Sequence, residues 1–291
     1  MSKTILTHDG KFHADDVFAV ATLLLREPSS TVLHTRDSLL LEKGDFVVDV
    51  GGVYDDVKNR FDHHQVGGAG TRENGIPYAA FGLVWKKFGN EFCTDAEVAR
   101  RVEEVLVVPI DANDNGIDIA VPKTSGISPY EISDAIHAFV PTWREEEAQN
   151  ESAFTEAVGF AKRIISREIK RAEAVVYGKR EVEEIYHTTT DKRLIVLPED
   201  YSWKDVLGKF PEPLYVVHPQ DETWRLYCVR NNLRLFANRK DLPKSWAGLR
   251  DEALAKVTGV PDAIFCHRNR FMAVAKTREG ALELARLALA N

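Results

Sequence analysis

Residues 46–50 constrain the fold of this chain more than any other stretch, because they are apolar at every position except Asp49. A nearly continuous apolar run of this length is typical of a strand buried on both faces of a parallel sheet. Gly51 and Gly52 end the run. Strand and helix patterns alternate along the chain around it, which predicts an α/β fold with an open parallel sheet.

The other elements of this N-terminal part follow from short β-branched runs and from apolar residues at helical spacing. The expected strands cover residues 4–7, 31–35 and 46–50, and the expected helices cover residues 14–25, 79–88 and 96–108. Asp111 and Asp114 come after the segment 105–110 and could join the edge of the sheet where the strands end.

The second half of the chain has a different pattern of charged and apolar residues. Residues 145–177 are charged, lack proline and carry apolar residues at helical intervals, which predicts a long amphipathic connecting helix. Short strands mixed with helices follow, which indicates a second, smaller α+β domain. The expected strands are 194–197, 214–217, 224–229, 263–266 and 271–275, and the expected helices are 203–209, 249–257 and 279–289. The predicted boundaries are 1–145 for the first domain, 146–184 for the connecting helix and 185–291 for the second domain.

Composition narrows the class of protein. Hydrophobic residues make up 44% of the chain and charged residues 29%, which is ordinary for a soluble globular protein. No apolar run approaches the ~20 residues that span a bilayer, and no charged-then-apolar leader precedes the first strand. The three cysteines, Cys93, Cys228 and Cys266, are far apart and odd in number. We therefore expect reduced thiols and a cytoplasmic location, not a disulfide framework or a zinc knuckle.

The formal net charge is −7. This charge argues against wholesale coating of duplex nucleic acid, because such binding needs a strong basic excess. A nucleic-acid enzyme stays open, since bound divalent cations would offset clustered acids locally.

Histidines and carboxylates gather where the expected strands end. Five of the nine histidines lie in the first 64 residues, and His8, Asp49 and the triplet Asp62-His63-His64 follow predicted strands or lie at their carboxyl ends. In open α/β sheets, ligands bind at that edge. The candidate direct metal ligands are His8, His13, Asp15, Asp49, His63 and Asp111, with Asp16, Asp62, His64 and Asp114 nearby.

Imidazole and carboxylate without thiolate are the ligands of Mn²⁺, Fe²⁺ or Zn²⁺ in hydrolytic sites. The donors suffice for two ions with a bridging carboxylate, and a water between such ions becomes a hydroxide that can attack phosphorus. An oxygen-rich site of high coordination favours Mn²⁺ over zinc, whose sites are usually four-coordinate, although iron, zinc or Mg²⁺ could occupy it. The chain is therefore expected to be a metallohydrolase.

Each motif has a simpler interpretation when it is taken alone. His13-Ala14-Asp15 could be a helix N-cap with a solvated neighbour, and Asp49 could be a turn residue. Residues 111–116 resemble a turn or a fragment of a calcium loop, but they lack the terminal glutamate of that loop, so calcium is rejected. The coincidence of the motifs at successive strand ends favours a metal site.

Basic and aromatic residues outside these motifs are candidates for substrate binding. His267, Arg268 and Arg278 belong to a basic group of the second domain that could clamp phosphate, or that could simply be a solvated surface. Arg36 follows a strand near the edge that carries the candidate ligands. Four tryptophans could either stack bases or pack in a core or an interface: Trp143, Trp203, Trp224 and Trp246.

Together these segments resemble the motifs of the DHH phosphoesterase superfamily. The motifs are His8 with His13 and Asp15, the run Asp49-Val50-Gly51-Gly52, the triplet Asp62-His63-His64, and Asp111. More narrowly, the chain resembles the melanocyte-proliferating-gene family of metal-dependent hydrolases over nearly its whole length. The segments that carry this second resemblance are residues 49–54, 60–65, 114–116, 248–254 and 277–281.

The resemblance implies a DHH-type fold, in which a doubly wound, mainly parallel catalytic domain is joined to a smaller α+β domain and the substrate cleft lies between them. It also implies Mn²⁺-dependent phosphodiester hydrolysis, and for this family a 3′-to-5′ exonuclease that acts on RNA or short single-stranded oligonucleotides.

The resemblance further implies roles for individual residues. By motif matching, Asp49 would bridge the ions, His63 would bind one of them and His64 would face the scissile phosphate. Asp62 would support the triplet as a fourth catalytic residue. The remaining ligands would be His8, His13, Asp15 and Asp111, with Asp16 and Asp114 as additional or supporting groups.

Two departures from the family pattern keep other substrates open. His13 stands where a carboxylate is usual, and Ala273-Val274-Ala275 stands where relatives carry two glycines and a histidine, so close approach of a substrate phosphate would be harder. The alternative function is a phosphomonoesterase or pyrophosphatase acting on a small phosphate compound. A third interpretation is a metal-stabilised binding module without activity. The oligomeric state also stays open, with a homodimer as one option.

Overall fold

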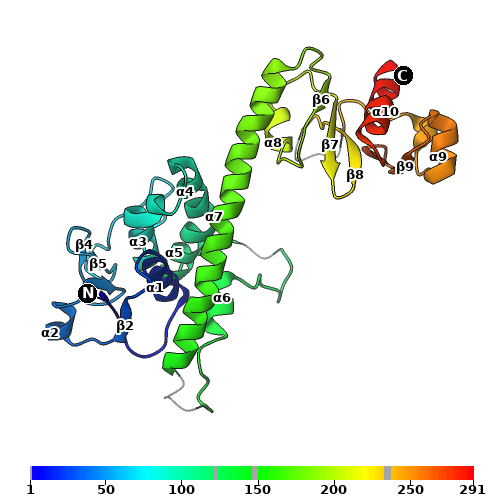
Figure 1. Cartoon of the computed structure of the whole chain (residues 1–291). Helices are drawn as coiled ribbons and strands as arrows, with labels where there is room; N and C mark the ends of the chain where they lie inside the picture. Colours follow the sequence, from blue (N-terminus) through cyan, green and yellow to red (C-terminus); the bar gives the residue numbers. More distant parts are fainter. Residues whose placement is uncertain (1, 121–122, 146–149, 233–236) are drawn as a thin grey trace. The chain divides into compact units, whose positions relative to one another are not determined.

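Figure 1 shows the computed structural model of the chain, which describes residues 2–120, 123–145, 150–232 and 237–291. The chain divides into two compact units, Met1–Glu173 and Ala174–Asn291. The division falls inside helix α7 (Asn150–Thr188), so the long helix contributes residues to both units. Residues 146–149, where the predicted connecting segment begins, lie outside the described residues.

The first unit is built on a five-stranded sheet in the order β2-β1-β3-β5-β4. Its strands are β1 (Thr4–Thr7), β2 (Thr31–His34), β3 (Phe46–Val48), β4 (Tyr54–Asp55) and β5 (Arg60–Phe61). β1 runs parallel to β2 and β3, and β3 runs parallel to β5, whereas β4 is antiparallel to β5. The predicted α/β fold with a mainly parallel sheet is confirmed, while the doubly wound, DHH-type arrangement stays a prediction.

Strand β3 ends in a sharp turn. All three of its residues are buried, as the apolar run predicts. The next residue, Asp49, has a φ of 54° in the left-handed region, which aspartate visits more readily than most side chains. Gly51 and Gly52 follow with φ values of 96° and 66°, which glycine adopts without steric cost. The chain therefore leaves the sheet at Val48 and holds Asp49 at the carboxyl end of β3.

The helices of the first unit differ from prediction mainly near residue 108. They are α1 (Ala14–Arg26), α2 (Ser38–Leu41), α3 (Ala80–Phe88), α4 (Ala96–Val102), α5 (Val108–Asp114) and α6 (Ile132–His137). A π-helical turn, Glu103–Val107, joins α4 to α5 without a break. In the described parts of the chain, no helix combines the length and the apolar composition needed to cross a membrane.

The helix predicted over residues 96–108 continues to Asp114, so Asp111 and Asp114 lie in α5. The turn that residues 111–116 resemble covers Asn115 and Gly116. The predicted end at residue 108 reflects Pro109, because proline lacks an amide hydrogen and clashes with the carbonyl of the preceding turn of a regular α-helix. A π-helical turn just before Pro109 is one known way to accommodate such an interruption.

Helix α1 lies at the centre of the first unit. Every residue from Ala14 to Leu23 is buried, and the helix packs against α3, α5 and α6 (Figure 1). The rings of Phe18 in α1 and Phe81 in α3 lie 5.4 Å apart. Because α1 is surrounded in this way, the two acids in its first turn, Asp15 and Asp16, are also buried.

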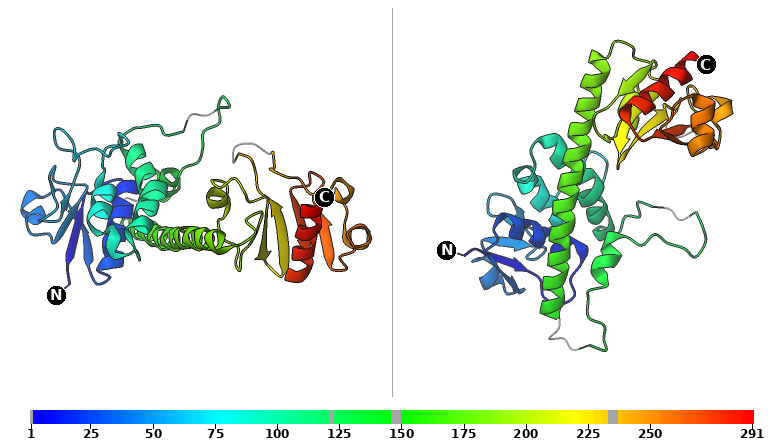
Figure 2. Two further views of the ribbon diagram at one scale, coloured as in Figure 1. Left: turned by 90° about the horizontal axis from the view of Figure 1, so that it is seen from above. Right: turned by 45° about the vertical axis from the view of Figure 1, so that its right-hand side comes forward.

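The second unit contains another five-stranded sheet, in the order β6-β7-β8-β10-β9. Its strands and helices are coloured from yellow-green to red in Figure 2. Its strands are β6 (Leu194–Val196), β7 (Tyr215–Gln220), β8 (Thr223–Cys228), β9 (Ala263–Cys266) and β10 (Met272–Ala275). Its helices are α8 (Lys204–Leu207), α9 (Asp251–Thr258) and α10 (Arg278–Ala290). β6 is parallel to β7, and the other neighbours are antiparallel. Two groups of buried side chains are present, and successive residues of β7 alternate between them, as the pleat of a strand requires.

Candidate metal centre

Three parallel strands end at the same edge of the first sheet. His8 follows β1, Asp49 follows β3, and the triplet Asp62-His63-His64 follows β5. Because β1, β3 and β5 are neighbours and parallel, their carboxyl ends meet. Side chains that are far apart in the sequence therefore converge at this edge.

Three groups of side chains here have the geometry to hold a metal ion. They are His8, His13 and Asp49; Asp49, His63 and His64; and Asp15, His63 and Asp114. Within each group, one ligand atom of each residue lies within 4.8 Å of the others. Asp49 belongs to two groups and His63 to two, so the groups overlap. The arrangement suits two neighbouring cations better than a single one.

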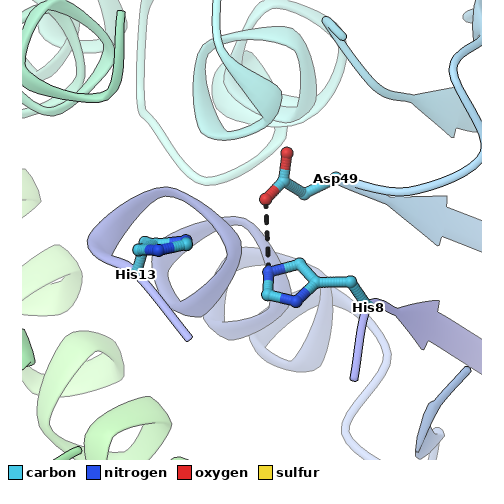
Figure 3. Close-up of side chains that lie close together, drawn as sticks. All are labelled: His8, His13 and Asp49. Atoms are coloured by element: carbon cyan, nitrogen blue, oxygen red, sulfur yellow. Dashed lines mark ion pairs between the residues drawn. The ribbon is translucent and has the colours of Figure 1, made fainter. Parts of the chain in front are cut away.

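Asp49 lies between histidines on two sides. Its Oδ2 is 3.5 Å from Nε2 of His8, and its Oδ1 is 3.4 Å from Nε2 of His63 and 3.4 Å from Nδ1 of His64. Figure 3 shows the carboxylate of Asp49 above the ring of His8, with His13 at the start of α1 to the left; the two imidazole rings lie 5.8 Å apart. The bridging role of Asp49 stays a prediction, and this position is the one that such a role requires.

His8 is held so that one specific nitrogen faces the site. Its Nδ1 hydrogen-bonds the carbonyl oxygen of Asp9 at 3.0 Å, and a carbonyl can only accept, so Nδ1 carries the hydrogen. Nε2 is then the nitrogen that faces the site, 3.2 Å from Oδ2 of Asp16, and loss of its proton would free its lone pair for a metal ion. A backbone carbonyl that fixes the tautomer in this way is typical of histidines that bind metals.

Asp15 and Asp111 hold the start of helix α3. Asp15 accepts hydrogen bonds from the amides of Ala80 (2.9 Å) and Phe81 (2.7 Å), and Asp111 accepts one from the amide of Gly82 (3.0 Å). Asp15 is also a member of one of the three candidate metal groups, whereas Asp111 is a member of none of those found among the described residues. One turn further along α5, Asp114 has its Oδ2 3.0 Å from Nε2 of His63.

The other members of the triplet have different environments. Asp62 is 1% exposed and accepts hydrogen bonds from the amides of Gly52 (2.5 Å) and His64 (3.1 Å). The side chain of His64 is 62% exposed, and its Nδ1 lies 2.7 Å from Oδ1 of Asp62. Asp62 thus orients His64, whose ring lines a cavity of about 780 Å³ over the site.

Two histidines of the site, His8 and His63, have strongly raised pKa values in the protein without metal. Burial alone would lower the pKa of His63, but the close carboxylates of Asp114 and Asp49 outweigh it and raise the pKa to about 11. Burial also opposes protonation of His8, yet Asp16 and Asp49 raise its pKa to about 10. The pKa of Asp15 is well above its usual value because of burial and of the charges on Asp114 and Asp49. The site therefore has a negative potential that attracts cations.

The contacts among these buried atoms point to the same conclusion. Oδ2 of Asp16, Oδ1 of Asp49 and Nε2 of His63 are buried, and their imidazole–carboxylate contacts of 3.0–3.4 Å lack the geometry of a well-formed hydrogen bond. Polar atoms in that state are costly unless another partner satisfies them. The donor set, the poorly paired atoms and the negative potential fit divalent cations, which the residues of the three groups above would hold.

Several residues at the site were missed by the sequence analysis. Lys11 and Asn113 line the cavity beside Arg36. Arg36 itself was predicted, and its Nε lies 2.7 Å from Oδ1 of Asp9. Arg72 is only 8% exposed in its side chain and pairs with Asp111 (2.7 Å) and Glu103 (2.8 Å). The position of Lys11 between His8 and His13 was the available signal for that residue, and Arg72 had none beyond its place in a glycine-rich stretch after the triplet.

The predicted substrate residues of the second unit do not form one group. His267 and Arg268 lie in the turn between β9 and β10, where Nδ1 of His267 accepts a hydrogen bond from the amide of Asn269 (3.0 Å). Arg278 begins α10, beyond the other end of β10, and lies 5.9 Å from the ring of Trp224. The four residues of β10 separate the two places. Trp203 and Trp246 are 5% and 4% exposed, so they pack in the core and do not stack bases.

The first unit is an α/β structure whose parallel strands deliver histidines and carboxylates to a candidate binuclear metal centre, which is the architecture of a metal-dependent hydrolase. The chain belongs to the MYG1 family: its residues 4–289 match the family model described as "Uncharacterised protein family (UPF0160)". The family that the sequence motifs predicted is thereby confirmed.

Relatives of this chain are similar over nearly its full length. The MYG1 protein of Caenorhabditis elegans is 32% identical over 99% of this chain and 96% of its own length. The MYG1 protein of Schizosaccharomyces pombe is 31% identical over 98% of this chain and 97% of its own length. The human MYG1 exonuclease is 30% identical over 98% of this chain and 85% of its own length.

Solved structures are far less similar. RecJ from Thermus thermophilus, in complex with Mn²⁺, shares 11% identity at a TM-score of 0.28. This chain spans about half of that chain, 52% of its length. A likeness of this degree carries no argument about fold or metal.

Proposed function

We propose that this protein is a metal-dependent phosphodiester hydrolase, and more narrowly a 3′-to-5′ exonuclease that shortens RNA or short single-stranded oligonucleotides with two Mn²⁺ ions. The observation that carries the proposal is the position of Asp49, whose two carboxylate oxygens face different histidines, His8 and His63. Membership of a family that includes a human MYG1 exonuclease supports the nuclease class.

The residues of the site would have different roles in such a reaction, namely metal binding, orientation of the phosphate and attraction of the anionic substrate. Two divalent cations, when bound, supply Lewis acidity to the phosphate and lower the pKa of a water. Asp49 holds the ligand sets together, and the carbonyl of Asp9 keeps Nε2 of His8 free for binding. His64 holds its Nδ1 hydrogen toward Asp62, so in the imidazolium form its Nε2 can donate a hydrogen bond to a phosphate oxygen in the cavity. Arg36 and Lys11 line the same cavity and add positive charge for an anionic substrate.

The test is the digestion of a short single-stranded RNA that carries a label at its 5′ end. With Mn²⁺ we expect a ladder of products shortened from the 3′ end and release of mononucleotides. Asp49→Asn is expected to lower kcat more than ~100-fold, because even groups that only support metal ligands cost 10- to 100-fold when removed. The matched control is Asp118→Asn, an exposed aspartate of the same unit that does not line the cavity. Intact RNA after incubation with Mn²⁺, or shortening from the 5′ end alone, would contradict the proposal.

A second candidate is a phosphomonoesterase or pyrophosphatase acting on a small phosphate compound. It is favoured by the segment Ala273-Val274-Ala275 in β10, where the family resemblance leads us to expect two glycines and a histidine, and by the net charge of −7. Rates on oligonucleotides, on small phosphate esters and on pyrophosphate in one Mn²⁺ assay separate the two candidates. A binding module without activity would be indicated if His63→Ala changed none of these rates.

A further inference from the structure

A second cavity, of about 380 Å³, adjoins the metal cavity in the first unit. The two cavities share Gly10 and Lys11 in their walls. The rest of the second cavity is formed by residues 140–143, by Glu145 and by Asn150 at the start of α7, and its apolar part includes Trp143. The two cavities are therefore neighbours along the loop that carries Gly10 and Lys11.

Hydrogen bonds fix the walls of the second cavity. Nδ2 of Asn150 donates to the carbonyl oxygen of Gly10 at 2.6 Å, which ties α7 to the loop that carries Lys11. The amide and the hydroxyl of Thr142 both donate to Oε2 of Glu145, at 2.7 Å and 2.8 Å. The segment that carries Trp143 is thus closed on itself, and the cavity is defined by bonded elements on two sides.

Trp143 is 87% exposed, in contrast to the buried Trp203 and Trp246. An indole ring in water has no packing role in the folded chain, and its exposure costs free energy that a stacked ring would recover. The guanidinium of Arg144 lies 4.9 Å from the ring centroid, so cationic and aromatic surfaces occur side by side. Nucleobases stack on such surfaces in proteins that bind single strands.

Lys11 supplies the charge that a nucleotide chain requires between two such sites. Its side chain is exposed and lines both cavities. A phosphate that joins a nucleotide in the metal cavity to its neighbour in the second cavity would pass this ammonium group. Lysine binds phosphate as a point charge, so it tolerates the varied geometry of a flexible strand.

We propose that Trp143 and Lys11 form a subsite for the nucleotide next to the scissile phosphate, in which Trp143 stacks on the base and Lys11 contacts the phosphate. The proposal rests on the phosphodiesterase function proposed above. It assigns the substrate class to single-stranded oligonucleotides of two or more residues, because a phosphodiester without bases leaves Trp143 unused.

The test measures binding and turnover separately in the full-length protein with Mn²⁺. Binding is followed by fluorescence anisotropy of a labelled phosphorothioate pentanucleotide, and turnover is followed on an unmodified pentanucleotide and on bis(p-nitrophenyl) phosphate. Trp143→Ala is expected to raise Kd about 5- to 150-fold, the range for loss of one base-stacking contact. The ratio of kcat/KM for the pentanucleotide to that for the small diester should fall by a similar factor, and Trp143→Phe should restore most of it.

Two further variants sharpen the result. Lys11→Gln is expected to weaken binding and to reduce the slope of log Kd against log salt concentration by about 0.7, the value for one phosphate contact on a single strand. Tyr130→Ala is the matched control, because Tyr130 is an aromatic residue that is 74% exposed and lines neither cavity. It should leave both Kd and the kcat/KM ratio unchanged.

The outcomes distinguish this proposal from the proposed function. If the wild-type protein binds the pentanucleotide through Trp143 but cleaves no phosphodiester, the subsite stands and the proposed function fails. If the wild-type protein cleaves the pentanucleotide and Trp143→Ala keeps Kd within twofold, the subsite is overturned and the function stands. If Trp143→Ala lowers kcat/KM equally on the pentanucleotide and on the small diester, Trp143 only supports the fold, and the subsite is also overturned. Failure of the wild-type protein to bind the pentanucleotide overturns it as well.

Discussion

At the scale of single residues, protons and metal ions compete for the same atoms in the candidate metal centre. His8 and His63 each face two carboxylates through Nε2. These carboxylates raise the pKa of His8 to about 10 and that of His63 to about 11, although burial opposes the shift. In the metal-free protein both rings are therefore protonated at neutral pH, and a cation that binds there must displace both protons.

This competition predicts that Mn²⁺ binds more tightly as the pH rises. Between pH 6.5 and 8.5, both below the raised pKa values, the Kd for Mn²⁺ should fall by up to about tenfold per pH unit for each displaced proton. Isothermal titration calorimetry in buffers of different ionisation enthalpy measures both the Kd and the number of protons released. A Kd that stays constant over this range, with no proton release, would show that His8 and His63 do not bind the metal.

The stability of the metal-free protein should change in the opposite direction. A histidine whose pKa is raised on folding stabilises the native state fully below about pH 6.5, and that contribution is lost as the pH rises to about 10 or 11. Burial also raises the pKa of Asp111, to about 7, which removes stability between about pH 4 and 7. In EDTA, the free energy of unfolding measured in urea should therefore decrease as the pH rises.

At the scale of elements, the start of helix α3 is where the fold and the site depend on each other. Its first three amides donate to Asp15 and Asp111, so the helix N-terminus is capped by carboxylates from α1 and α5. A Cβ on Gly82 would lie 1.8 Å from Oδ2 of Asp111 and 2.6 Å from Nη2 of Arg72. Only glycine fits between helix α3 and this buried ion pair.

Gly82→Ala should therefore destabilise the first unit by at least about 1–3 kcal/mol, the usual range for overpacking a buried site. The matched control is Gly159→Ala in α7, where a Cβ would meet nothing within 4 Å. That variant should stabilise by about 0.5–1 kcal/mol, because alanine loses less backbone entropy than glycine in a helix. Urea unfolding of both variants measures the difference, and equal stabilities would show that the contact at Gly82 is relieved by movement.

Among the elements, those set by local sequence pattern could be predicted, and contacts between distant segments could not. The apolar run at 46–50 predicted β3, and the helical spacing at 14–25 and 79–88 predicted α1 and α3 to within a residue at each end. The positions of His8 and Asp49 after strands were also readable, since strand ends are set by local pattern, whereas the two-residue strand β5 before His63 was too short to be assigned a range. The approach of Asp114 to His63 was not readable either, because it depends on the path of the helix that contains Pro109. Arg72 was missed because its partners, Asp111 and Glu103, are distant in sequence.

At the scale of the whole molecule, each unit has its own buried core. The second unit contains two clusters of buried side chains around its sheet, and all three candidate metal groups belong to the first unit. Metal binding should therefore stabilise the first unit directly. Helix α7 contributes residues to both units.

Calorimetry with and without Mn²⁺ is expected to show this difference. Saturation at 100 times Kd adds about 2.7 kcal/mol to the unit that binds the metal. We expect two unfolding transitions, of which EDTA lowers one and leaves the other nearly unchanged. One transition that shifts as a whole would show that α7 couples the units into one cooperative structure.

The π-helical turn at Glu103–Val107 has a consequence for the phase of the helix that follows it. A π turn contains one residue more than an α turn, and each residue of an α-helix advances the side-chain direction by about 100°. Deleting one residue from this turn would therefore rotate Asp111 and Asp114 together by about that angle, away from Arg72 and His63. The number of residues in this turn therefore fixes the direction in which Asp111 and Asp114 point. An insertion or a deletion there would displace these side chains from the metal centre without replacing any of its ligands.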